Sequence, residues 1–246
     1  MITFKSKEDF EKMSKAGKAV KNIHEEIHNH AKEGVSLKEL DSLAKKVIKG
    51  SGCKSNFFEY RGYPSYICTS PNDVIVHGIP TDYRLKDGDI LSIDAGAIFE
   101  GVHADAAVTY GIGNISKQAQ KLLDTTCLAL SEAIGLVRDG QALGTIGHKI
   151  QSTGEKNSYG VVREYIGHGI GFEMHEDPQV PNYGEKGKGL RLKEGMAICI
   201  EPMFNLGSEE TYIEEDNWTV KTKDGSLSAH FEHTIGLTSN GVEIFT

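Results

Sequence analysis

The sequence predicts an α+β fold built from two similar halves. In each half, two segments with the helical spacing of apolar residues precede a series of short β-rich runs separated by Pro and Gly. No linker or low-complexity segment divides the 246 residues, although no residue-level repeat relates the halves. We therefore expect one domain over residues 1–246, with a shared antiparallel sheet and the functional site where the halves meet.

Two helices are expected at the start of the chain. A capping-box pattern at Ser6 and Asp9 begins the first, and its apolar stripe predicts a helix that extends to about Gly34. The same pattern recurs at Ser36 and begins a second helix, which Gly50 ends. The two helices should pack side by side on the sheet.

The remaining elements follow the same order. Between residues 63 and 110 the pattern becomes β-rich, in the runs YICTS, VIVHG, DILSIDAGAIF and VHADAAVTY. Helices are again predicted over residues 116–138 and 143–157. Strands then return around VVREYIG, GMAICIEPMF, AHFEHTIGLT and VEIF.

Composition excludes several classes of function. A net charge of −8, from 27 basic and 35 acidic residues, argues against sequence-independent nucleic-acid binding. The start of the chain has no leader pattern, and no apolar run approaches the roughly 20 residues that span a bilayer, so we expect a cytoplasmic protein without membrane contact. The cysteines form no C-x-x-C pair, which suits a reducing compartment. They are Cys53, Cys68, Cys127 and Cys199.

Acidic residues inside predicted strands are the first sign of a functional site, because buried carboxylates need a partner. Asp94 and Asp105 flank the turn I-F-E-G. If this hairpin is symmetric about the bond between Phe99 and Glu100, the two aspartates face each other directly across the strands. Two carboxylates so close would repel unless a proton or a cation lay between them. A metal ion is the simplest explanation.

Two histidines lie in the glycine-rich segment G-H-G-I-G-F-E-M-H-E-D-P. Glycines on both sides of His168 would let the backbone approach another element closely, and His175 follows seven residues later. A single strand histidine is usually a core residue, but two around such a segment favour a functional role.

Glu201 in A-I-C-I-E-P and Glu232 in A-H-F-E-H-T-I add two carboxylates whose neighbours look buried. With the two aspartates they offset the charge of two divalent cations, which leaves His168 as a neutral nitrogen ligand. This oxygen-rich set suits Mn, Fe(II), Co or Zn. Two such ions can share a bridging water and lower its pKa, so the predicted reaction class is metal-assisted hydrolysis.

A competing motif lies in the first helix. His24 to His28 reads H-E-E-I-H and matches the zinc-peptidase pattern H-E-x-x-H. No third ligand follows in a recognisable pattern. We interpret the match as chance on an exposed helix edge, with neither histidine binding metal.

Five motifs, taken together, resemble type I methionine aminopeptidases of the short bacterial form. They are H-G-I-P at 77–80, I-D-A-G with D-A-A eleven residues later, G-H-G-I-G followed by H-E-D-P, I-E-P-M, and F-E-H-T-I. The resemblance covers essentially the whole chain. It implies the pita-bread fold, in which two pseudo-symmetric αα/ββ halves surround a curved antiparallel sheet, as a single catalytic metallopeptidase domain. It also implies removal of the N-terminal methionine from nascent proteins whose next residue is small, by a metal-bridged water or hydroxide.

The resemblance assigns roles to individual residues. The metal ligands for two divalent ions, drawn from Co, Mn, Fe(II), Zn and Ni, would be Asp94, Asp105, His168, Glu201 and Glu232. Asp105 and Glu232 would bridge the ions, and Glu201 would also serve catalysis. His77 and His175 would act on the substrate amide and the tetrahedral intermediate rather than bind metal.

A methionine pocket is implied at Tyr60, Tyr63, Cys68, His77 and Trp218. Phe57 and Met174 depart from the residues that the family often carries at these positions, so the pocket should have its own shape. The substrate partner would be the N-terminal methionine of a nascent chain, with transient ribosome contact and a monomeric enzyme.

Two alternatives remain open at this point. An Xaa-Pro peptidase of the same fold would use a similar metal set, and a non-catalytic binding protein would use the fold as a peptide or ribosome platform. All five ligand positions are present, which favours an enzyme.

Overall fold

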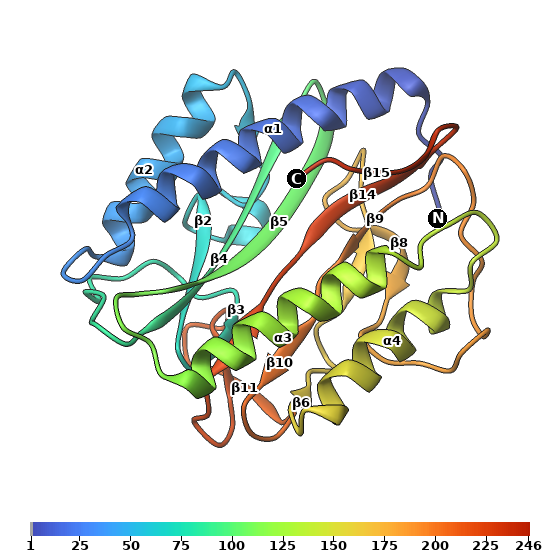
Figure 1. The fold of residues 1–246 in the computed structure, drawn as a ribbon. Coiled ribbons are helices and arrows are strands. Elements are labelled where there is room, and N and C mark those ends of the chain that lie inside the picture. Colours follow the sequence, from blue (N-terminus) through green and yellow to red (C-terminus); the bar gives the residue numbers. More distant parts are fainter. Residues whose placement is uncertain (1) are drawn as a thin grey trace.

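The computed structural model describes residues 2–246 and follows the predicted order of two helices, strands, two helices and strands (Figure 1). The short strands at Lys54–Ser55, Glu176–Val180, Thr211–Ile213 and Val220–Thr222 were not predicted. Helices α1 (Lys7–His30) and α2 (Leu37–Gly50) belong to the first half. Helices α3 (Lys117–Ile134) and α4 (Leu143–Lys156) belong to the second. None of the helices within residues 2–246 is long and apolar enough to cross a membrane.

The helix starts follow the predicted capping chemistry. Ser6 and Ser36 both accept a hydrogen bond from the third residue of the helix, whose carboxylate accepts the backbone N–H of the serine in return. The first helix ends at His30, before Gly34, because the chain turns there and the Gly34 N–H donates to the Leu85 carbonyl at 2.8 Å. The third helix likewise ends one residue before Gly135, earlier than predicted.

The sheet of the first half is centred on β4. This strand (Ile90–Phe99) pairs antiparallel with β5 (Val102–Gly111), β2 (Ile67–Pro71) and β1 (Lys54–Ser55). A 3-10 turn, η1 (Tyr60–Gly62), lies between β1 and β2. Helix α1 packs across β4 and β5.

The other strands form three further antiparallel sheets. Their orders are β15-β14-β9-β7-β8, β13-β10-β6 and β11-β12-β3. The bounds are β3 (Val74–Val76), β6 (Gly160–Val161), β7 (Gly167–Gly169), β8 (Glu176–Val180), β9 (Ala197–Ile200), β10 (Met203–Asn205), β11 (Thr211–Ile213), β12 (Val220–Thr222), β13 (Ser228–His230), β14 (His233–Thr238) and β15 (Gly241–Ile244). The shared sheet is thus divided into four hydrogen-bonded segments.

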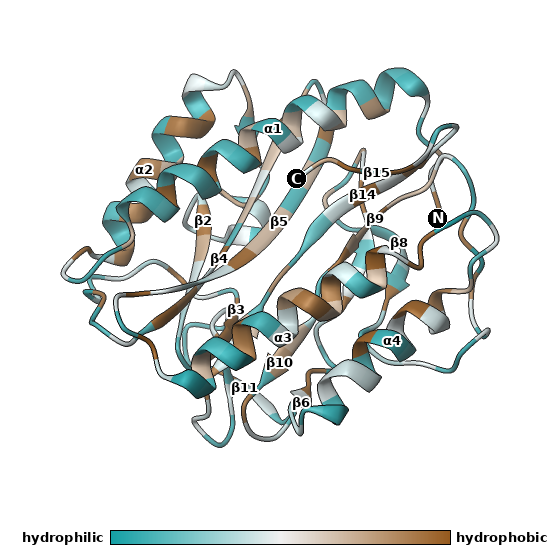
Figure 2. Cartoon of the chain, in the orientation of Figure 1, coloured by the Kyte–Doolittle hydropathy of each residue, from teal (hydrophilic) through white to brown (hydrophobic). Residues whose placement is uncertain are grey.

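Each half has its own apolar core. One buried cluster lies between α1, α2 and the β4 sheet, and includes Met13, Ile23 and Ile93. The other lies under α3 and α4, and includes Leu122 and Phe204. In Figure 2 the outward face of α1 is largely hydrophilic, as expected for helices that bury one stripe against a sheet.

The halves meet where β5 runs beside β14 and β13 (Figure 1). Two threonine side chains join them. The Thr234 hydroxyl accepts from the Asp105 N–H and donates to the Asp105 carbonyl, both at 2.8 Å. The Thr109 hydroxyl bonds the backbone of His230 in the same way, at 2.9 and 2.7 Å. This seam fixes β5 against the segment that carries Glu232.

The predicted turn of the β4–β5 hairpin lies one residue too early, so each β4 residue pairs two positions further along β5 than predicted. Phe99 pairs with Val102, so the turn is Glu100–Gly101, and both turn residues have positive φ (46° and 82°). A two-residue turn of this kind matches the twist of the strands, and glycine supplies its second position. Asp94 therefore faces Ala107, and Asp105 faces Gly96. The aspartates become diagonal neighbours on one face, still within side-chain reach.

Glu201 and Glu232 do not lie inside strands as predicted. Glu201 follows the end of β9, where the chain passes from the five-stranded sheet to β10. Glu232 lies between β13 and β14, where the chain passes back. The predicted strand VVREYIG is also interrupted, and only its ends form β6 and β7. The two glutamates thus occupy equivalent crossing points between sheets.

His24 is not on an exposed helix edge, so that part of the prediction is wrong. It lies on the buried stripe of α1, with Nε2 3.0 Å from the Ala106 carbonyl oxygen and Nδ1 2.9 Å from the Tyr110 hydroxyl. Burial lowers its pKa to about 4, which keeps the ring neutral. His28 is exposed. Among residues 2–246, neither histidine joins a group of potential metal ligands.

Replacing His24 and His28 separately should distinguish a core histidine from a ligand. His24→Ala should lower the free energy of unfolding by about 1–3 kcal/mol, because it leaves buried hydrogen-bonding groups unpaired. His28→Ala should change it by less than about 0.5 kcal/mol. Denaturant unfolding measures both, and metal analysis should find the wild-type content in each. Loss of bound metal from either variant would favour the zinc-peptidase interpretation instead.

Candidate metal centre

Three carboxylates converge at the seam between the halves. Asp94 from β4, Asp105 from β5 and Glu232 from the crossing after β13 each place an oxygen within 4.8 Å of the others. One oxygen of each (Oδ1, Oδ1 and Oε1) is buried without a hydrogen-bond partner. Buried anionic oxygens left unpaired are costly, so this arrangement needs a cation or protons.

His168 and Glu201 lie beside these carboxylates. Nε2 of His168 is 3.7 Å from Oε1 of Glu201. Nδ1 of the same ring is 2.9 Å from the Gly169 carbonyl oxygen, to which it donates. The ring proton therefore lies on Nδ1, and the lone pair of Nε2 faces the centre, as metal-binding histidines require.

The glycines around His168 allow this placement, as the sequence predicted. A Cβ on Gly167 would lie 2.3 Å from the Cys199 carbonyl oxygen, and one on Gly169 would lie 2.1 Å from the Asp177 carbonyl oxygen. Only glycine permits such an approach between β7 and its neighbours, and the approach brings the imidazole to the carboxylates.

The electrostatics of the three converging carboxyl groups favour protonation. Burial raises the pKa of Asp94 to about 7. Burial, reinforced by the charge of Asp94, raises the pKa of Asp105 well above its usual value. The pKa of Glu232 is raised in the same way by burial and by the charge of Asp105. At neutral pH these carboxyl groups retain protons unless a cation takes the place of the protons.

Glu201 differs from the other three acids. Burial acts to raise its pKa, but the imidazoles of His230 and His168 outweigh that effect, so the pKa is lowered. Glu201 is therefore held as a carboxylate with histidines on both sides.

These donors fit divalent metal ions. Four carboxylates and one neutral imidazole supply hard oxygen ligands with a single nitrogen, a set that suits Mn, Fe(II), Co or Zn. The unpaired oxygens of Asp94, Asp105 and Glu232 are the observation that supports this fit.

A pocket of about 180 Å³ opens next to the acids and is lined by Asp94, Glu201, His77 and His175, among others. His77 has φ 59°, a conformation unusual for a residue with a side chain, and such backbone strain is common at functional sites. Nδ1 of His175 is 2.9 Å from the Tyr60 hydroxyl. Burial lowers the pKa of His175 to about 4, so its ring is neutral.

An apolar cluster adjoins this pocket. It brings together most of the residues predicted to bind a methionine side chain, together with Phe57 and Met174. Tyr63 packs edge-on against Trp218 with ring centroids 5.1 Å apart, and Trp218 in turn lies 6.4 Å from the His77 ring. The cluster comprises Phe57, Tyr60, Tyr63, Cys68, Ile79, Met174 and Trp218.

The loop that carries His175 is fixed by the next residue. The buried carboxylate of Glu176 accepts the backbone N–H groups of Phe172 (2.7 Å) and Glu173 (3.1 Å). Its other oxygen pairs with Lys5 at 2.6 Å, near the start of the chain. This buried ion pair connects the N-terminal segment to the loop beside the centre.

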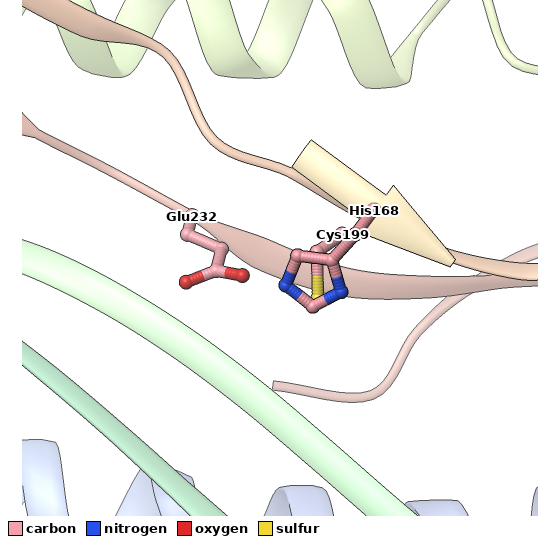
Figure 3. A group of neighbouring side chains, drawn as sticks. All are labelled: His168, Cys199 and Glu232. Atoms are coloured by element: carbon pink, nitrogen blue, oxygen red, sulfur yellow. The ribbon is translucent and has the colours of Figure 1, made fainter. Parts of the chain in front are cut away.

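Two residues of the centre were missed in the sequence. The thiol of Cys199 lies within 4.8 Å of donor atoms of His168 and Glu232, and Figure 3 shows the three side chains together. His230 lines the pocket of Asp94 and Glu201. Each lies two positions before a predicted ligand, Glu201 or Glu232, and in the strands predicted there from the sequence, alternation would place such residues on the same face. That spacing could have identified both.

Comparison with known proteins gives a consistent result. The chain matches metallopeptidase family M24 over residues 11–239. Methionine aminopeptidase 1 of Bacillus subtilis is 48% identical over 246 residues, which are 100% of this chain and 99% of that protein. The crystal structure of methionine aminopeptidase from Rickettsia prowazekii has a TM-score of 0.98 at 44% identity and covers 100% of both chains. Prolidase from Pyrococcus furiosus has a TM-score of 0.81 at 23% identity, over 99% of this chain and 65% of its own, which is a likeness of fold alone.

Divalent metal should stabilise the protein more at neutral than at acidic pH. Asp94 has a folded pKa of about 7, raised from 3.8. In the metal-free protein, the contribution of protonated Asp94 to the free energy of unfolding is therefore lost as pH rises through that value. Metal binds the ionised form and removes this loss. The difference in melting temperature between Mn-loaded and chelated protein should therefore grow from about pH 5 to about pH 7.5. Equal differences at both pH values would contradict a metal site at these carboxylates.

Proposed function

This chain belongs to metallopeptidase family M24, and we propose that it is a methionine aminopeptidase, which removes the N-terminal methionine of proteins whose second residue is small. The pita-bread fold predicted from the sequence is confirmed by the TM-score of 0.98 with a methionine aminopeptidase structure. The observation that carries the proposal is the convergence of unpaired buried carboxylates beside a pocket lined by the imidazoles of His77, His175 and His230. We take residues 1–246 as one catalytic domain.

Members of this family use divalent metal, and we infer that two ions bind here. Asp94, Asp105 and Glu232 would hold one, and His168 with Glu201 would hold the other, sharing Asp105 and Glu232. Four carboxylates balance the charge of two divalent ions, which supports the number. When bound, the metals supply an activated water and polarise the scissile carbonyl. Their identity, among Co, Mn, Fe(II), Zn and Ni, is left to experiment.

His77 and His175 contact the substrate in this mechanism. Because the Tyr60 hydroxyl lies at Nδ1 of His175, the neutral ring can accept that hydroxyl and keep its proton on Nε2. Nε2 then donates to the carbonyl oxygen as negative charge develops on it. His77, which lines the same pocket, would hydrogen-bond the scissile amide.

The apolar cluster supplies the specificity for methionine. An unbranched thioether is flexible and polarisable, and it packs well against aromatic rings and a buried thiol. Tyr63, Cys68 and Trp218 offer such a lining, with Tyr60 packed against it. The His77 ring contacts Trp218 and also lines the pocket of Asp94 and Glu201. Phe57 and Met174 pack in the same cluster, and we infer that they contribute to the shape of this pocket.

The cellular setting follows from the substrate. We infer that the enzyme acts in the cytoplasm, where nascent chains carry their first methionine. The four cysteines are all free, which suits a reducing compartment. Contact with the ribosome would be transient, since a net charge of −8 provides little attraction to RNA phosphates. We infer a monomer, because the centre is built from one chain.

Peptide cleavage by metal-loaded and chelated protein tests this function directly. Met-Ala peptides should be cleaved, Met-Phe peptides should react far more slowly because a bulky second side chain clashes beside the acids, and Xaa-Pro peptides should be poor substrates. Chelation should abolish cleavage, and added Mn, Fe(II) or Co should restore it. Equal rates on Met-Ala and Met-Phe, or full activity without metal, would refute the proposal. Preference for Xaa-Pro would indicate a proline peptidase instead.

Separate replacement of the two histidines of the glycine-rich segment tests their different roles. His168→Ala should lose metal affinity and turnover together, because it removes the nitrogen ligand. His175→Ala should keep its metal but lose about 10²–10⁴-fold in kcat, as expected for a positioned acid–base or oxyanion-stabilising group. Metal titration by calorimetry, alongside steady-state kinetics, measures both. The opposite pattern would reverse the assignment.

A further inference from the structure

The imidazole of His230 is a buried group to which the proposed mechanism gives no role. The residue ends β13 and is 1% exposed. Its backbone N–H and carbonyl both bond the Thr109 hydroxyl across the seam, at 2.9 and 2.7 Å. Because both backbone groups of His230 are held by this hydroxyl, the direction of its Cα–Cβ bond is fixed as well. The ring lines the pocket formed by Asp94, His175 and Glu201.

The charged neighbour of this ring is Glu201. Nε2 of His230 lies 3.6 Å from Oε2 of Glu201, while Nε2 of His168 lies 3.7 Å from Oε1. Two imidazoles thus flank one carboxylate, one at each oxygen. A separation of 3.6 Å exceeds a hydrogen bond, and Nε2 of His230 is buried without any partner.

The two imidazoles cannot play the same part. His168 donates from Nδ1 to the Gly169 carbonyl, which leaves the Nε2 lone pair for a metal. His230 lies at Oε2 of Glu201, the oxygen that His168 does not face, so a metal held by His168 would be reached through Oε1. With the ring proton on Nε2, a buried N–H left without an acceptor is unfavourable, and a small rotation of the Glu201 carboxylate would bring Oε2 within hydrogen-bond distance.

We propose that His230 is a positioning residue of the metal centre: its Nε2–H hydrogen-bonds Oε2 of Glu201 and so directs Oε1 toward the metal that His168 also binds. This inference rests on the proposed metallopeptidase function. With Oε2 engaged, Glu201 is restricted to one-oxygen ligation in a fixed orientation. Outer partners of this kind commonly set metal affinity by orienting the ligand.

Two substitutions separate the hydrogen bond from the bulk of the ring. His230→Leu removes the donor but keeps an apolar side chain, whereas His230→Gln keeps an N–H donor at similar reach. Co(II) titration of the metal-free proteins by calorimetry, with the Co(II) absorption spectrum, gives a readout independent of turnover. His230→Leu should bind Co(II) about 10–100-fold more weakly and shift the spectrum, and His230→Gln should recover most of both.

The control is His233→Leu, three residues further along. The His233 ring lies 3.1 Å from the Thr246 hydroxyl, away from the pocket, so this variant should keep wild-type Co(II) binding. A double variant locates the effect. If His230 acts through the metal that His168 holds, His230→Leu should cost little further affinity in a His168→Ala background, since effects within one unit are not additive.

The outcomes are distinct. Wild-type Co(II) affinity and spectrum in His230→Leu would overturn the inference, as would a His230→Gln variant as weak as His230→Leu, which would mean that ring packing alone matters. Full additivity with His168→Ala would also overturn it. Failure of the proposed function looks different, because the wild-type protein itself would then bind no Co(II) and cleave no Met-Ala peptide.

Discussion

Mutual repulsion among buried carboxylates is the constraint on which this structure depends. Asp94, Asp105 and Glu232 come from three separate chain segments, yet their oxygens lie within 4.8 Å of one another. Like charges at that distance in a buried site are unfavourable, and burial, together with the charge of a neighbouring carboxylate, raises the pKa of all three groups. The fold must supply enough stability elsewhere to hold them together without a cation.

That stability comes from two apolar cores and from a seam made by side chains. Each helix pair buries its own cluster, so the halves have separate cores. At the seam, Thr109 and Thr234 bond backbone groups of the opposite half. A hydroxyl can both donate and accept, so one threonine satisfies an N–H and a carbonyl together. The seam therefore joins β5 to the second half although β5 and β14 form no regular backbone ladder.

The imidazoles around the acids are distinguished by what each ring's other nitrogen contacts. His168 donates from Nδ1 to a backbone carbonyl, and His175 meets the Tyr60 hydroxyl at Nδ1. The carbonyl acceptor places the ring proton of His168 on Nδ1, and in the proposed mechanism the Tyr60 hydroxyl donates to His175 and leaves its proton on Nε2. Chemically identical side chains can thereby take the different roles proposed for them.

The sequence by itself determined the fold class, the helices with their capping boxes, and the set of acids and histidines that could form a centre. Those features depend on local periodicity and on residue chemistry, which the sequence states directly. Only the tertiary structure decided the turn at Glu100–Gly101, and with it the diagonal placement of Asp94 and Asp105. Moving the centre of the turn by one residue changes every cross-strand pair. The burial of His24 and the approach of His230 to Glu201 were likewise decided in three dimensions. Both arise where separate segments pack together, and no local pattern in either segment records that contact.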